Sequence, residues 1–327
     1  FFWVILGIEG VLIASEEIKL PSKVIPKGLL LSFFTIIILL LIVSSSYIGF
    51  LDRSTIHFPY VRMHELIRFS PPYKMVFGII QHPIIQMMML GGIISLSFLA
   101  FVSAFFVTSR LIFAMGRDRF FFGSLGKLNP RFHTPSLAVI FLTAIVSIAL
   151  IAVPEFVTLG LILAAPVLII FATMALTAAI LRKTHAETPR PFSIPCLKCF
   201  SIFVFVLATI LIFWLGWPWT LGGGGFFLVV LPIYLLVHKR REPIMKSLWL
   251  IVYVLGLILL SYLGDPAFVY ENFTSIKPLG LITYPSAFFV VGFFGIVIFL
   301  WGYYENIKIQ KEESLLRDKS SAISDLN

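Results

Sequence analysis

The sequence predicts an all-α bundle of helices that crosses a membrane many times. Its 327 residues are 59% apolar and only 13% charged, whereas soluble domains carry about a quarter charged residues. Disordered chains have the opposite balance, with few apolar residues and a high net charge. The charged residues here also cluster, and long stretches between the clusters carry no Asp, Glu, Lys or Arg. These observations exclude a disordered chain and argue against a soluble globule.

Nine apolar segments of the chain read as membrane spans. A helix needs about 20 residues to cross a hydrocarbon layer of about 30 Å. The charge-free interval between Lys198 and Lys239 is long enough for two helices, and we expect Trp217–Trp219 and Gly222–Gly225 to form the turn between them. A transmembrane β-barrel would instead alternate apolar and polar residues. The predicted spans lie at about 1–15, 29–51, 86–114, 136–153, 156–181, 200–216, 221–237, 247–263 and 285–304.

The basic residues predict the orientation of these spans. If the segment joining the first two spans is cytoplasmic and the sides then alternate, 20 of the 25 Lys and Arg residues face the cytoplasm. Cytoplasmic loops are enriched in Lys and Arg, so the asymmetry supports the span count and explains the net charge of +9 without a nucleic acid partner. We therefore expect a plasma-membrane protein with a polar cytoplasmic tail at 305–327. The opposite side keeps Arg53, Arg62, Arg68, Lys74 and Lys277.

A single carboxylate lies inside a predicted span. Glu9 stands between Gly7 and Gly10 in the first apolar segment. Ionisable residues inside membranes usually face a cavity and act on a substrate or on protons. The two glycines weaken the helix there and allow backbone carbonyl groups to face a ligand. The alternative is a peripheral helix whose Glu9 lies near the helix end in water.

Three motifs occur in order along the chain. The first motif is Gly7-Ile-Glu9, followed by Ser15-Glu-Glu17, Pro21 and Ile25-Pro26. The second is Thr108–Asp118, followed by Leu128-Asn-Pro130 and Thr134-Pro135. The third is Arg190–Pro195, which reads Arg-Pro-Phe-Ser-Ile-Pro. They resemble helix six, the end of helix eight with its loop, and the segment between helices ten and eleven of amino acid permeases in the amino acid–polyamine–organocation superfamily. Leu20 stands where Asn is usual, and Arg119 where Gly is usual.

The resemblance implies a partial inverted-repeat fold of the LeuT type, with helices one and six broken at mid-membrane. The chain would correspond to helices 6–14 of a fourteen-helix member and would lack the first five. The implied function is secondary active transport of amino acids or related amines by alternating access. We expect the chain alone not to perform coupled uptake, because half of the implied substrate contacts belong to the missing helices.

The resemblance also implies roles for individual residues. Trp3, Leu6, Gly7 and Gly10 fall in the substrate pocket, and Glu9 falls where some members carry a gating or proton-linked glutamate. The hydroxyls of the third span, notably Ser103 and Thr108 beside Ser95 and Ser97, are candidates for a cation site. The coupling ion would be a proton or sodium. The commoner alternative is that these hydroxyls bond back to the preceding helical turn.

Other features suggest weaker hypotheses. Cys196 and Cys199 have CxxC spacing, but a zinc site needs four ligands and the sequence has no second pair, so we expect no metal and no cofactor. Arg117, Arg119 and Lys127 are candidates for contact with membrane lipids.

A membrane-embedded enzyme would need several converging acidic or His side chains, and Glu9 is the one span carboxylate. A non-transporting membrane subunit and an inert truncated fragment remain alternatives.

The charge asymmetry generates a topological prediction. Single cysteines placed at Lys23 and in the C-terminal tail, with Cys196 and Cys199 replaced by Ser, should react with a membrane-impermeant maleimide only after the membrane is opened. A cysteine at Arg62 should react in intact cells. Labelling of the tail from outside would overturn the predicted number of spans.

Overall fold

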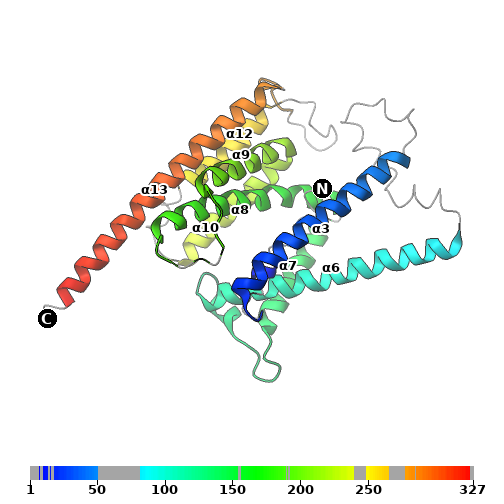
Figure 1. Cartoon of the computed structure of the whole chain (residues 1–327), viewed down its shortest axis with the longest axis horizontal. Coiled ribbons are helices and arrows are strands. Elements are labelled where there is room, and N and C mark those ends of the chain that lie inside the picture. The colour runs from blue at the N-terminus through cyan, green and yellow to red at the C-terminus, as the bar shows by residue number, and fades with distance from the viewer. Residues whose placement is uncertain are drawn as a thin grey trace. The chain divides into compact units, whose positions relative to one another are not determined.

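The computed structural model of the protein is a set of helices (Figure 1). It describes residues 7, 10–13, 15, 18–50, 82–153, 156–188, 190, 192–238, 248–264, 277–283 and 285–324. Within these ranges the chain forms nine α-helices and one 3₁₀-helix. Its β structure there is limited to an isolated bridge between Gly264 and Ile282. The predicted all-α class is confirmed.

The helices belong to two compact units, Phe1–Ser147 and Ile148–Asn327, whose boundary falls inside α7. The first unit contains α2 (Gly10–Ile13), α3 (Pro21–Phe50), α6 (Pro83–Arg117), the 3₁₀-helix η3 (Gly123–Gly126) and most of α7 (Ser136–Ala152). The second contains α8 (Phe156–Thr184), α9 (Leu197–Leu215), α10 (Trp219–His238), α12 (Leu248–Leu263) and α13 (Ser286–Ser324). Proline begins both α3 and α6, where its missing N–H has no helical partner to lose.

Apolar helices occupy the positions of most predicted spans. Among the described helices, α3, α6, α8, α9 and α13 are long and apolar enough to cross a membrane. The helix α7, the Trp219–Pro232 part of α10 and α12 are apolar but shorter. The predicted span at 1–15 lies mostly outside the described residues. The helical bundle agrees with an integral membrane protein, and the division into nine spans stays a prediction.

The four glycines at 222–225 lie inside α10 and do not form the predicted turn. The turn is formed by Gly216 with Trp217 and Pro218, whose peptide bond is cis, and so agrees with the other predicted segment, Trp217–Trp219. A Cβ at Gly223 would lie 2.6 Å from the carbonyl oxygen of Ile162 on α8, and one at Gly224 would lie 3.1 Å from Ile258 on α12. Gly223 and Gly224 thus let α10 approach its neighbours closely, as small residues permit in membrane bundles, whereas a Cβ at Gly222 would make ordinary contact and one at Gly225 would meet nothing within 4 Å.

The polar segment that follows the last predicted span is helical over most of its length. Helix α13 does not end with its apolar part at 304 but continues to Ser324. Residues 305–324 contain no Gly or Pro and are rich in Lys, Glu, Leu and Arg, which are good helix formers. Figure 1 shows this part of α13 extending beyond the other helices of the second unit.

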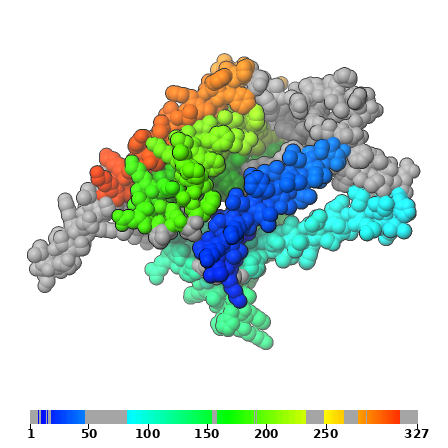
Figure 2. All heavy atoms as spheres, viewed as in Figure 1, coloured from blue at the N-terminus to red at the C-terminus, as the bar shows by residue number. Residues whose placement is uncertain are grey.

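The core of the second unit combines aromatic rings with a buried hydrogen bond. The ring of Phe205 on α9 lies 5.0 Å from that of Tyr253 on α12 and 5.6 Å from that of Phe299 on α13, centroid to centroid. The Thr209 hydroxyl donates to the Phe205 carbonyl at 2.7 Å and lies 2.9 Å from the Tyr253 hydroxyl. Because Thr has one hydroxyl hydrogen, Tyr253 is the donor in that pair. Figure 2 shows α9 and α13 packed side by side.

This direction of donation predicts unequal effects of two substitutions. Thr209→Val removes the acceptor of a fully buried Tyr253 hydroxyl and should lower the free energy of unfolding by about 1 kcal/mol. Tyr253→Phe leaves Thr209 bonded to Phe205 and should cost less, and the double variant should resemble Tyr253→Phe alone. Thermal unfolding in detergent measures all three. An equal or larger loss for Tyr253→Phe would contradict the assignment.

Candidate functional site

The chain turns at Gly7, where the sequence predicts a weakened helix. Gly7 has φ of 105°, a conformation that residues with a side chain rarely adopt. Its carbonyl accepts a hydrogen bond from the Gly10 N–H at 3.0 Å, and the short helix α2 begins at Gly10. A further turn, with Leu20 at φ of 54°, precedes α3. Gly7 itself is therefore a turn residue that precedes α2 and not a helical one.

Helix α2 is held against α6. Gly10 is buried, and a Cβ on it would lie 3.2 Å from Cγ2 of Val107 on α6. At Gly7, by contrast, a Cβ would meet nothing within 4 Å. The two glycines of the motif thus serve different purposes: Gly7 permits the backbone conformation, and Gly10 permits the close approach to α6.

The structure describes two of the predicted pocket residues. Gly7 and Gly10 lie three residues apart on the turn into α2. Trp3, Leu6 and the predicted gating residue Glu9 lie outside the described residues. Their roles stay predictions, and so does substrate binding by Gly7 and Gly10.

The hydroxyls of α6 fall into two groups. Ser97 donates to the Ile93 carbonyl at 2.8 Å, and Ser109 donates to the Phe106 carbonyl at 2.9 Å, as in the alternative in which hydroxyls bond back within the helix. Ser103 is exposed, and Thr108, next to Val107, is half-buried. The cation site at Ser103 and Thr108 stays a prediction.

The basic residues at the end of α6 contact groups on their own helix. The guanidinium carbon of Arg110 lies 3.3 Å from the ring centroid of Phe106, within cation–π range. The Nε of Arg117 donates to Asp118 Oδ1 at 3.2 Å. Both contacts join residues that are neighbours along α6 or at its C-cap.

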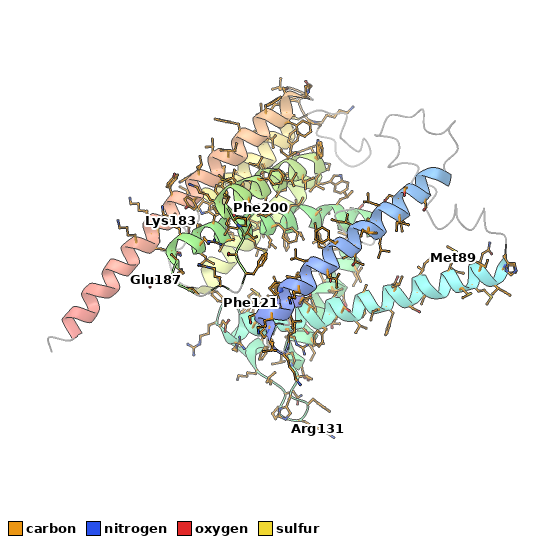
Figure 3. All side chains as sticks on the ribbon, viewed as in Figure 1. Met89, Phe121, Arg131, Lys183, Glu187 and Phe200 are labelled. Atoms are coloured by element: carbon orange, nitrogen blue, oxygen red, sulfur yellow. The ribbon has the colours of Figure 1, made fainter. Side chains whose placement is uncertain are left out.

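The loop after α6 is built by close backbone contacts. Gly116 packs on the backbone of Leu125 and Gly126, where a Cβ would clash. Asn129 Oδ1 accepts the Arg131 N–H at 2.9 Å, and the Asn129 N–H donates to the Thr134 carbonyl at 2.8 Å. Figure 3 shows Arg131 at the tip of this loop. The Asn-Pro and Thr-Pro motifs thus shape a turn before α7.

Arg190 closes the end of α8. Its guanidinium donates to the carbonyls of Leu181, His185 and Ala186 at 3.2, 2.5 and 3.3 Å. The last carbonyls of a helix lack partners within it, and a cation there also interacts favourably with the helix dipole. The third motif therefore has a structural role in the second unit, which its sequence alone does not reveal.

The described residues hold no group of three or more His, Cys, Asp or Glu side chains that could bind a metal ion. Cys196 and Cys199 are free and exposed at the start of α9, and Cys196 precedes the helix with φ of 49°. The geometry at these two cysteines adds nothing to the CxxC hypothesis.

Comparison with known proteins decides the family. The sequence model described as amino acid permease matches residues 1–237, which include the Gly7 turn, α6 and all three motifs. The chain belongs to the amino acid permease family. The predicted superfamily is thereby confirmed, whereas the LeuT-type details stay predictions.

Several curated relatives of this permease are bacterial transporters. It is 24% identical to the glutamate/serine transporter AimA of Bacillus subtilis over 97% of the chain and 59% of the relative. It is 22% identical to the aspartate-proton symporter of the same organism, over 92% and 58%. The branched-chain amino acid permease BcaP of that organism is 27% identical over 74% of the chain and 50% of the relative. No solved structure matches the chain.

The permease therefore spans less than two thirds of the length of each of these relatives. Its match to the first two covers nearly the whole chain.

The two glycines of the motif should respond differently to substitution. Gly10→Ala should loosen α2 from α6 because the new Cβ crowds Val107, and Val107→Ala should restore the packing. Gly7→Ala should strain the backbone by about 1–3 kcal/mol, and Val107→Ala should not relieve it. Hydrogen–deuterium exchange of residues 10–13, with Val107→Ala alone as the control, measures both effects. Rescue of Gly7→Ala by the Val107 variant would contradict the assigned roles.

Proposed function

We propose that the chain belongs to a secondary active permease that carries amino acids or related amines across the plasma membrane by alternating access. The observation that carries the proposal is the family match over residues 1–237. That match includes the non-helical backbone at Gly7 and its contact with α6. Unwound backbone inside a membrane is tolerated where it faces a cavity or other protein.

The proposed substrate site is the turn at Gly7. The three relatives are named for glutamate and serine, for aspartate and for branched-chain amino acids. These substrates share an ammonium and a carboxylate group but differ in their side chains. A backbone turn suits the shared part, because its carbonyl groups accept from ammonium whatever the side chain is. Gly7 and Gly10 would bind through backbone atoms, while Trp3 and Leu6 would line the pocket.

Coupling is proposed to involve Glu9. One relative is named a proton symporter, and an intramembrane carboxylate is the usual protein group for a proton relay. A proton is therefore the favoured coupling ion. Sodium is the alternative, and Ser103 and Thr108 on α6 would then contribute hydroxyl ligands.

Transport is proposed to require more protein than this chain. None of the most apolar window of α3 or α6 is buried, whereas 33% of that window is buried in α8 and in α9. The relatives are also longer, since the chain spans 59% of the first. We propose that further helices pack against α3 and α6 and supply the rest of the pocket. Without them the chain would be a non-transporting fragment, which is the alternative function.

The proposed orientation follows from the basic residues. With the C-terminal half of α13 in the cytoplasm, the loops after α6 and α8 face the same side and carry Arg131 and Arg190 among their cations. This is the arrangement that the positive-inside rule favours.

Uptake assays test the proposal. A transport-competent form of the protein in proteoliposomes should take up at least one of the amino acids glutamate, serine, aspartate, leucine, isoleucine and valine. Glu9→Ala should abolish or strongly lower this uptake. Glu9→Gln should leave substrate affinity nearly unchanged and flatten the dependence of the rate on pH, because the amide cannot take up a proton.

The matched control is Glu187→Gln, which alters an exposed carboxylate in the loop after α8. It should transport as the unmodified protein does. Wild-type rates in Glu9→Ala would remove Glu9 from the site, and an unchanged pH profile in Glu9→Gln would contradict its proton-linked role. Absence of uptake for every amino acid tested would contradict the proposed function.

A further inference from the structure

Three helices of the second unit meet at one tyrosine. Tyr303 of α13 lies beside Lys183 near the end of α8 and Lys198 near the start of α9. The Lys198 Nζ is 4.5 Å from the centroid of the Tyr303 ring and 5.4 Å from that of Tyr304, and the Lys183 Nζ is 5.9 Å from the Tyr303 centroid. Figure 3 shows Lys183 and Phe200 marking this end of α8 and α9 beside α13.

The tyrosine ring is fixed in place. Tyr303 is only 4% exposed and stacks on Phe299, with ring centroids 6.1 Å apart and planes 11° apart. The preceding residue, Gly302, lies so close to α8 and α12 that a Cβ would be 2.9 Å from Leu176 Cδ2 and 3.0 Å from Trp249. The Arg190 guanidinium, which caps α8, holds the segment between the two lysines. The Tyr303 ring is therefore a rigid platform beneath two exposed ammonium groups.

Within the part of the chain that the structure describes, the two ammonium groups have no anionic partner. Lys183 and Lys198 are both exposed, and neither forms an ion pair with a carboxylate of the described residues. Glu187, the acidic residue nearest to both lysines in sequence, and Glu305, two residues after Tyr303, do not pair with them. Two cations that share one ring repel each other, so an anion placed between them would be attracted by both.

Lys183, Lys198 and Tyr303 lie at the ends of apolar helix segments, where lipid headgroups are expected. Tyr303 ends the apolar part of α13, Lys183 follows that of α8, and Lys198 precedes that of α9. Tyrosine rings concentrate at the level of lipid headgroups, and lysines there extend their ammonium groups into the interface. On the predicted orientation this is the cytoplasmic leaflet, which carries anionic lipids.

We propose that Lys183, Lys198 and Tyr303 form a binding site for the phosphate of an anionic lipid headgroup, which anchors the ends of α8, α9 and α13 to the inner leaflet. The site needs the positive charges of both lysines. The buried Tyr303 ring holds these charges at one place, which distinguishes them from lysines that act only by setting the orientation of the protein in the membrane. It requires membrane insertion but does not depend on the proposed transport activity.

Native mass spectrometry of the purified 327-residue chain in detergent tests the site. Phosphatidylglycerol should bind more tightly than phosphatidylcholine with the same acyl chains. Lys183→Gln/Lys198→Gln should weaken the first phosphatidylglycerol by about tenfold, since each lysine near a membrane surface contributes appreciably to anionic lipid binding. Lys198→Arg, which keeps the charge, should retain the affinity.

The matched control is Lys19→Gln/Lys23→Gln, which removes two exposed lysines predicted to face the same side. It should bind the first phosphatidylglycerol as the unmodified chain does. An equal loss in both double variants would show a general charge effect and overturn the site, as would equal binding of the two lipids. Displacement of the lipid by millimolar inorganic phosphate would identify a free-anion site and overturn the lipid assignment. The melting temperature of each variant, measured without lipid, should match that of the unmodified chain.

Discussion

Hydrocarbon offers no hydrogen-bonding partner to a peptide group, and this constraint accounts for most of the described fold. A backbone that satisfies its own polar groups inside a bilayer must be helical or form a closed barrel. The described chain is helical over almost all of its apolar length. Its departures are then informative. Gly7 leaves the helical conformation within an apolar segment, next to a buried Gly10 that packs on α6.

Close helix packing replaces the hydrophobic effect as the means of assembly. In lipid, apolar side chains gain little from leaving their surroundings, so helices associate through tight contacts and a few hydrogen bonds. The second unit uses both: Gly223, Gly224 and Gly302 allow close approach to neighbouring helices, and Tyr253 bonds to Thr209 across two helices. The apolar windows of α3 and α6 are unburied. On the proposed function, transport would depend on further helices that pack against α3 and α6.

Composition and charge spacing were sufficient to predict the all-α class, because length and hydropathy are strong signals in a membrane protein. The prediction of a turn at Gly222–Gly225 was wrong, since glycine marks a turn in one context and a close helix contact in another. The sequence predicted a polar tail after residue 304 but not its secondary structure, and the structure shows that α13 extends through this segment to Ser324. The roles of Arg190 as a helix cap and of Tyr303 as a platform depend on contacts between distant segments, which a single sequence does not encode visibly. The turn at Gly7 was predictable because two glycines flank a carboxylate within an apolar segment of the sequence.

Photoaffinity labelling tests the central claim, that an amino acid binds at the backbone turn before α2. A diazirine-bearing amino acid analogue would be photolysed on the transport-competent protein in lipid, with and without an excess of the unlabelled amino acid, and the modified peptides mapped by mass spectrometry. The account predicts labelling within residues 1–15 and near Val107 on α6 that the unlabelled amino acid suppresses. Suppressible labelling confined to α8–α13 would contradict it.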